Sequence, residues 1–226
     1  EKAIDEIKKA IEDFYINETE KNNIYTYFVW GNAYYMLGTL TNNEFLVDCS
    51  INKFTKTLSF NELNNEGKAE LLNSLGFCYK FKSNYNEAKT CYIDSIELFS
   101  SNTTIIYLVD CLADMEEDNK AEISEWDKKI EKDSLNKNEE YDYLIFRAKL
   151  ALKYDDYNLA EEVLKYLKEL NYGVIYFDNY VKEVTKRLED YCVNKNVESK
   201  SRLLIFLAEL KSRIMLEPNF YGIGFR

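Results

Sequence analysis

A pattern of small and aromatic residues that occurs twice constrains the fold more than any other feature of the sequence. Leu75-Gly76 is followed one turn later by Tyr79, and then by Ala88 and Tyr92 in the next segment. Upstream, the run Tyr27-x-x-Trp30-Gly31-Asn32-Ala33-Tyr34-Tyr35 repeats the first half of the pattern. A small residue at Gly76 and another at Ala88 let two helices approach closely, while aromatic rings fill the space beside them. Such a helix pair cannot bury its apolar face alone and must stack on neighbours.

The composition agrees with long helices joined by short polar turns. The chain of 226 residues is 46% hydrophobic and contains a single Pro and 7 Gly, so few positions interrupt a helix. The 19 Tyr and 13 Phe predict aromatic packing between helices, with some rings left for a binding surface.

The residues Leu75-Gly76, Tyr79, Ala88 and Tyr92 resemble the tetratricopeptide repeat, with Ser100 in the place of the family's final Pro. Repeats of this family are helix pairs of about 34 residues. The resemblance implies an all-α fold, namely a right-handed α-solenoid of antiparallel helix pairs with about 10–11 helices.

We therefore expect one repeat domain over residues 1–216. Its expected parts are a remnant or capping helix (1–16), four repeats (24–61, 69–102, 103–134 and 141–172) and an atypical C-terminal helix pair (174–216). In the first repeat, either the turn around Asn42 is expanded or the second helix starts early, near Glu44. Residues 217–226 are expected to be a tail or a junction to a further domain. The absence of an initiator Met suggests that the chain was cut from something longer.

The sequence offers little catalytic or metal-binding chemistry. It has no His, which removes Ser-His and Cys-His dyads, and no cysteine spacing suits structural zinc. Adjacent acidic residues such as Asp155-Asp156 and Glu161-Glu162 point about 100° apart on a helix, so we interpret them as solvated surface. Ser50-x-x-Lys53 matches an acylation motif, but its partner motifs S-D-N and K-T-G are missing. We expect no enzyme activity and no cofactor or metal.

The resemblance implies a concave groove that is lined by the first helix of each repeat and holds a peptide. The groove positions in this sequence are Phe28, Asn32, Tyr35, Asn73, Phe77, Lys80, Tyr107 and Lys149. Aromatic rings there would anchor a peptide, and Asn32 and Asn73 could recognise its main chain, because an amide side chain both donates and accepts. The alternative is that the aromatic residues pack between repeats. The family's clamp for a chaperone's C-terminal carboxylate is incomplete, since Glu70 stands where a basic residue would help.

The leading functional hypothesis is therefore a protein- or peptide-binding scaffold. The alternative is a signal-peptide-sensing regulatory module of a larger bacterial regulator. A net charge of −11 makes nucleic acid and anionic membranes poor partners and a basic peptide easier to accept. Five cysteines, an odd number, indicate free thiols, and together with the lack of a signal peptide or membrane span they predict a cytoplasmic location.

Overall fold

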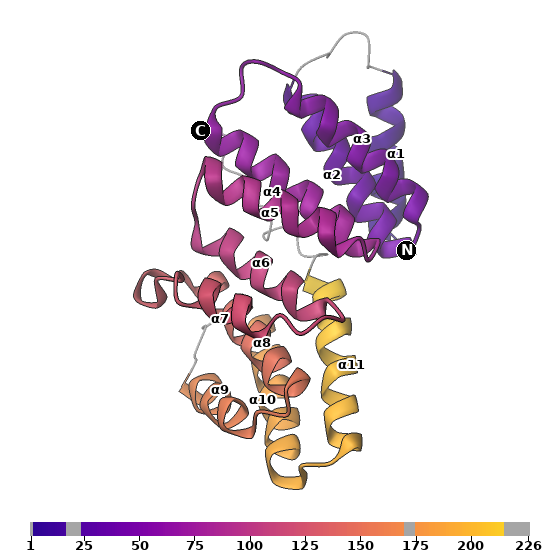
Figure 1. Cartoon of the computed structure of the whole chain (residues 1–226). Coiled ribbons are helices and arrows are strands. Elements are labelled where there is room, and N and C mark those ends of the chain that lie inside the picture. Colours follow the sequence, from indigo (N-terminus) through magenta and orange to yellow (C-terminus); the bar gives the residue numbers. More distant parts are fainter. Residues whose placement is uncertain (1, 17–23, 170–174, 215–226) are drawn as a thin grey trace. The chain divides into compact units, whose positions relative to one another are not determined.

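The computed structural model describes residues 2–16, 24–169 and 175–214, and every regular element within these ranges is helical (Figure 1). The α-helices are α1 (Lys2–Ile16), α2 (Ile24–Thr41), α3 (Glu44–Leu58), α4 (Asn65–Phe81), α5 (Tyr85–Leu98), α6 (Asn102–Asp114), α7 (Lys120–Asp127), α8 (Lys137–Lys153), α9 (Tyr157–Glu169), α10 (Ile175–Asn194) and α11 (Val197–Ile214). A short 3-10 helix, η1 (Lys132–Ser134), precedes α8. Consecutive helices pack on one another from α1 to α6 and again from α8 to α11. The predicted all-α class and number of helices are thereby confirmed for the described residues.

The helices are divided between two compact units, residues 1–117 and 118–226. The sequence predicted one repeat domain over residues 1–216, including a repeat at 103–134. In the structure α6 packs on α5 within the first unit, and α7 belongs to the second. Helix α7 has eight residues and buries the side chain of Ile123. The expected tail, 217–226, lies outside the described residues.

Helix α1 packs on α2 through one side and exposes charge on the other. Ile11 is buried, and Ile7 and Phe14 pack against the same cluster as Trp30 of α2. The opposite side carries exposed charged side chains: Glu6, Lys9 and Asp13. Helix α1 is therefore amphipathic, with its apolar side on α2 and its charged side exposed.

Four helix pairs are joined by turns with the same backbone geometry. Each turn contains one residue with a positive φ angle, two positions before the following helix: Asn42 (49°), Ser83 (60°), Asp155 (49°) and Lys195 (47°). These turns join α2 to α3, α4 to α5, α8 to α9, and α10 to α11. Positive φ is uncommon for residues other than Gly and often ends a helix, so its recurrence at equivalent positions marks a repeated structural unit.

The same local hydrogen bonds close these turns. The N–H of the residue after the left-handed position donates to a carbonyl five residues earlier: Asn43 to Gly38 (2.8 Å), Asn84 to Tyr79 (2.9 Å) and Asp156 to Ala151 (2.9 Å). The side chains of Asn43, Asp156 and Asn196 then accept from an N–H in the first turn of the next helix. Three of the turns therefore end one helix and cap the next, whereas Asn84 makes no side-chain cap bond at the start of α5. In the first pair the second helix does start early, at Glu44.

Glycine allows close approach of the helices in the first two pairs. A Cβ atom at Gly31 of α2 would lie 2.6 Å from the ring of Phe54 on α3, and one at Gly76 of α4 would lie 2.5 Å from the ring of Tyr92 on α5. Both rings are fully buried, with exposed fractions of 1% and 0%. The close helix approach predicted at Gly76 is confirmed, and the same relation holds at Gly31.

Candidate partner-binding face

The predicted site residues come mainly from alternate helices of the first unit. They are Phe28, Asn32 and Tyr35 on α2, Asn73, Phe77 and Lys80 on α4, and Tyr107 on α6. We call the surface that these residues define the α2–α4–α6 face. The eighth predicted residue, Lys149, lies on α8 in the second unit and is not part of this face.

An aromatic row crosses this face from helix to helix. The ring of Phe77 on α4 lies 6.5 Å from that of Tyr35 on α2 and 4.6 Å from that of Tyr107 on α6, centroid to centroid. The shorter contact is edge-to-face, the geometry in which the positive edge of one ring meets the negative face of another. The row thus joins three helices that are not neighbours in the sequence.

The α2 aromatic residues are more buried than a free binding surface would require. Phe28 is 3% exposed and packs on Phe54, with ring centroids 5.9 Å apart, and Tyr35 is 6% exposed. The positions of these two rings favour packing between helices, the alternative that the sequence left open. Phe77 and Tyr107 are half-buried, so they retain surface for a ligand.

Lys80 is held inside an ion-pair cluster between α4 and α6. Its ammonium group pairs with Asp110 and lies 2.7 Å from Asp114, and its side chain is 9% exposed. Burial alone would lower the pKa of Lys80, but the two carboxylates outweigh burial and raise it. Lys80 therefore stays charged and fixes α6 against α4, a role that the sequence did not assign to it.

The two predicted asparagines differ in their surroundings. Asn73 donates one of its two amide N–H groups to Thr104 Oγ1 on α6 (2.9 Å), so one donor is used within the protein. Its Oδ1 atom is buried and has no hydrogen-bond partner. Asn73 is thus partly engaged in joining α4 to α6, whereas Asn32 is half-buried on α2.

Two acidic residues continue the α4 part of the face and were not predicted as site residues. Glu66 and Glu70 precede Asn73 at helical spacing, and both are exposed. Partial burial raises the pKa of Glu70, and the nearby charge of Glu66 raises it further. The sequence already places these two carboxylates one turn apart on the same side of the predicted helix, where their charges repel each other. This unfavourable spacing could have marked them as candidate site residues.

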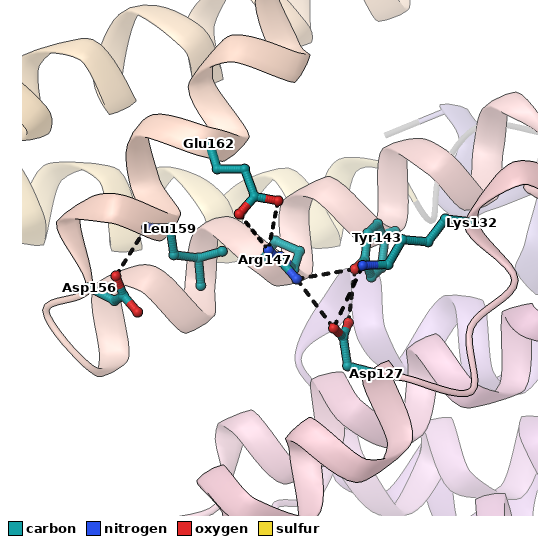
Figure 2. A network of polar contacts seen from close by, with 7 residues as sticks. All are labelled: Asp127, Lys132, Tyr143, Arg147, Asp156, Leu159 and Glu162. Atoms are coloured by element: carbon teal, nitrogen blue, oxygen red, sulfur yellow. Dashed lines mark hydrogen bonds and ion pairs between the residues drawn. The ribbon is translucent and has the colours of Figure 1, made fainter.

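A second polar cluster lies in the second unit and is centred on Arg147 of α8 (Figure 2). Its guanidinium group donates to Asp127 (3.2 Å) and to Tyr143 Oη (3.2 Å), and it donates to both carboxylate oxygens of Glu162 (3.0 and 3.1 Å). Tyr143 in turn donates to Asp127 (2.9 Å). Arg147 thus ties α7 and α9 to α8 through bonds made within the protein, and we interpret this cluster as structural.

The S-x-x-K motif is also part of the packing. Ser50 is fully buried and donates its hydroxyl proton to the carbonyl of Gly31 (2.8 Å), which lies on the neighbouring helix. The ammonium group of Lys53 lies 3.1 Å from the ring centroid of Trp30. Both side chains are engaged in joining α3 to α2.

Members of the adjacent acidic pairs have similar structural roles. Glu139 completes a capping box with Asn136 at the start of α8, and Asp156 caps α9. Asp155 pairs with Lys200 (2.6 Å) and accepts from Tyr191 Oη (3.3 Å), and the Lys200 bond lowers its pKa. These carboxylates do not converge on one point, in agreement with the surface interpretation.

Comparison of the chain with protein-family models, curated proteins and solved structures gives no match. Within the described ranges no helix has the length and apolar character to cross a membrane. Among the same residues, His, Cys, Asp and Glu side chains form no group of three or more that could hold a metal ion. The five cysteines are free thiols, and burial raises the pKa of Cys78 to about 12.

Proposed function

We propose that the chain is a helical-repeat module that binds a peptide or protein segment on the α2–α4–α6 face. The observation that carries the proposal is the aromatic row of Tyr35, Phe77 and Tyr107, which gathers one ring from each of three helices. Half-buried aromatic side chains next to hydrogen-bonding side chains are typical of peptide-binding surfaces.

The repeated turns support a solenoid of the tetratricopeptide type, right-handed and built from antiparallel helix pairs. The equivalent turn residues Asn42 and Ser83 lie 41 positions apart, and Asp155 and Lys195 lie 40 apart. This spacing is longer than the roughly 34 residues of that family. The proposed kinship is therefore with a variant in which the helices or the connections between pairs are lengthened.

Charge favours a basic partner for the first unit. Residues 1–117 contain 19 acidic and 10 basic side chains, whereas residues 118–226 contain 21 and 19. The excess negative charge is thus concentrated on the unit that carries the face, where Glu66 and Glu70 are exposed. Such a field attracts Lys- and Arg-rich segments and repels nucleic acid and anionic lipid. Five free thiols support a cytoplasmic location.

The test is a selection of 12-residue peptides from a random-sequence display library on the full chain. The best binders are then titrated against Asn32→Ala/Asn73→Ala and against a matched control, Asn52→Ala/Asn86→Ala, whose asparagines are exposed on α3 and α5. We expect the face variant to lose about thirtyfold in affinity, since it removes two hydrogen bonds that contribute about 1 kcal/mol each. The control should bind like the wild type. Equal affinities of the two variants would contradict the proposal.

A further inference from the structure

The α4–α5 pair carries polar side chains at positions where the α2–α3 pair carries apolar ones. Phe28 and Asn73 each stand three residues before the glycine of their pair, and Phe54 and Tyr92 are the rings that cover those glycines. In the first pair the two phenylalanine rings pack on each other. The same architecture therefore accepts two apolar rings, and neither the hydroxyl of Tyr92 nor the amide of Asn73 is needed to build it.

Both polar side chains of the α4–α5 pair leave an atom unsatisfied. Tyr92 Oη and Asn73 Oδ1 are buried, and neither has a hydrogen-bond partner. Buried polar atoms are almost always hydrogen-bonded, because an unpaired one destabilises the fold. Two such atoms in one helix pair, at positions that are apolar in the other pair, call for a functional explanation.

The ring of Tyr92 packs against two aromatic rings of the α2–α4–α6 face. The ring of Tyr92 has its centroid 6.0 Å from that of Phe77 and 6.2 Å from that of Tyr107, the two half-buried members of the aromatic row. Burial raises the pKa of Tyr92 well above its ordinary value, and the neighbouring Cys111 and Tyr35 add to the effect. The phenol therefore keeps its proton and is available as a donor.

We propose that Tyr92 and Asn73 form the floor of the binding site and hold an amide group of the bound segment. Tyr92 donates its O–H to the carbonyl oxygen of the amide, and Asn73 Oδ1 accepts the amide N–H. An amide offers one acceptor and one donor, which matches the two unsatisfied atoms. Entry requires the ring of Phe77 or Tyr107 to rotate, and side-chain rotations of this kind are common on binding. The inference rests on the proposed function, because it uses the same face.

The test compares Tyr92→Phe with Phe54→Tyr, which places a hydroxyl at the equivalent position of the first pair. The probes are fluorescein-labelled peptides from the display selection, titrated by fluorescence anisotropy, and each variant is also melted without peptide. We expect Tyr92→Phe to melt at the wild-type temperature or a few degrees above it, since it removes an unpaired hydroxyl. Its affinity for the peptides should fall about fivefold, the effect of one lost hydrogen bond. Phe54→Tyr should melt lower and bind as the wild type does.

Two results would overturn the inference. If Tyr92→Phe melts several degrees below the wild type, the hydroxyl is already bonded in the free protein, as it would be to an internal water. If the peptides bind Tyr92→Phe as tightly as the wild type while still losing affinity for Asn32→Ala/Asn73→Ala, the proposed function holds and this inference alone fails. A library that yields no peptide sensitive to Asn32 and Asn73 contradicts the proposed function itself.

Discussion

At the scale of single residues, Gly76 sets how closely α4 and α5 approach. An added methyl group would lie 2.5 Å from the buried ring of Tyr92, which has no free space to move into. We expect Gly76→Ala to lower the free energy of unfolding by about 1–3 kcal/mol, because overpacking outweighs the better helix propensity of Ala.

The matched control is Gly67→Ala in the first turn of the same helix. A methyl group there would meet Leu63 and Asn64 at 3.1 and 3.2 Å, distances that a small shift relieves. This variant should be unchanged or more stable by up to about 1 kcal/mol. Urea denaturation of both variants is the measurement, and equal stabilities would show that Tyr92 does not limit the helix approach.

The packing of Tyr92 over Gly76 was predictable from the sequence. A small residue and a large one at this spacing on two paired helices allow the helices to approach closely. The roles of the face residues were less predictable. Phe28 and Phe77 were both predicted as aromatic groove residues, yet one is 3% exposed and the other half-buried. The difference depends on which ring lies opposite, and such contacts come from helices far away in the sequence.

At the scale of helices, the Lys80 cluster holds α6 to α4. Lys80→Met leaves Asp110 and Asp114 without their ammonium group, at exposed fractions of 15% and 26%. We expect a loss of about 2–4 kcal/mol at neutral pH, because two largely buried carboxylates then lose the cation that lies between them. Lys82→Met, which removes a more exposed ion pair with Asp48, should cost less than about 1 kcal/mol.

The effect of Lys80→Met should depend on pH with a definite sign. The raised pKa of Lys80 keeps its ammonium group charged at neutral and acidic pH, and that charge is lost only as the pH rises through the raised value. In the variant, acid protonates Asp110 and Asp114 and removes the repulsion between their carboxylates. The difference in unfolding free energy between variant and wild type should therefore narrow as the pH falls toward 4. A constant difference would show that Lys80 acts through packing alone.

Most helices were predicted from apolar spacing, but the positive φ angle shared by the turns of the four helix pairs was not. The missed signal is the turn. Asn42-Asn43, Ser83-Asn84, Asp155-Asp156 and Lys195-Asn196 each place a polar residue before an Asn or Asp that starts a helix. The residues between α6 and α7 adopt no such positive φ angle. Hydrophobic spacing alone cannot distinguish a hairpin turn from a connection between hairpins.

At the scale of the whole molecule, the chain divides into two units, and the boundary in the sequence lies between Glu117 and Asp118. Each unit has its own buried core, with Trp30, Phe54 and Tyr92 in the first and Tyr141, Leu188 and Leu203 in the second. We expect residues 1–117 expressed alone to fold, with a helical circular dichroism spectrum and a cooperative thermal transition. They should also bind the selected peptides with the affinity of the full chain. An unfolded fragment would show that the first unit depends on the second.

The recurring left-handed turn has a consequence for how such a chain can change over generations. Each turn is closed by backbone hydrogen bonds to residues within a few positions of it. A helix pair therefore contains all the residues that form its own turn. Duplication or loss of a gene segment of about 40 codons therefore adds or removes a complete pair and leaves the geometry of the remaining pairs intact. The length of the chain can therefore change in steps of one helix pair. Loss of a single helix would leave its partner helix with an exposed apolar side.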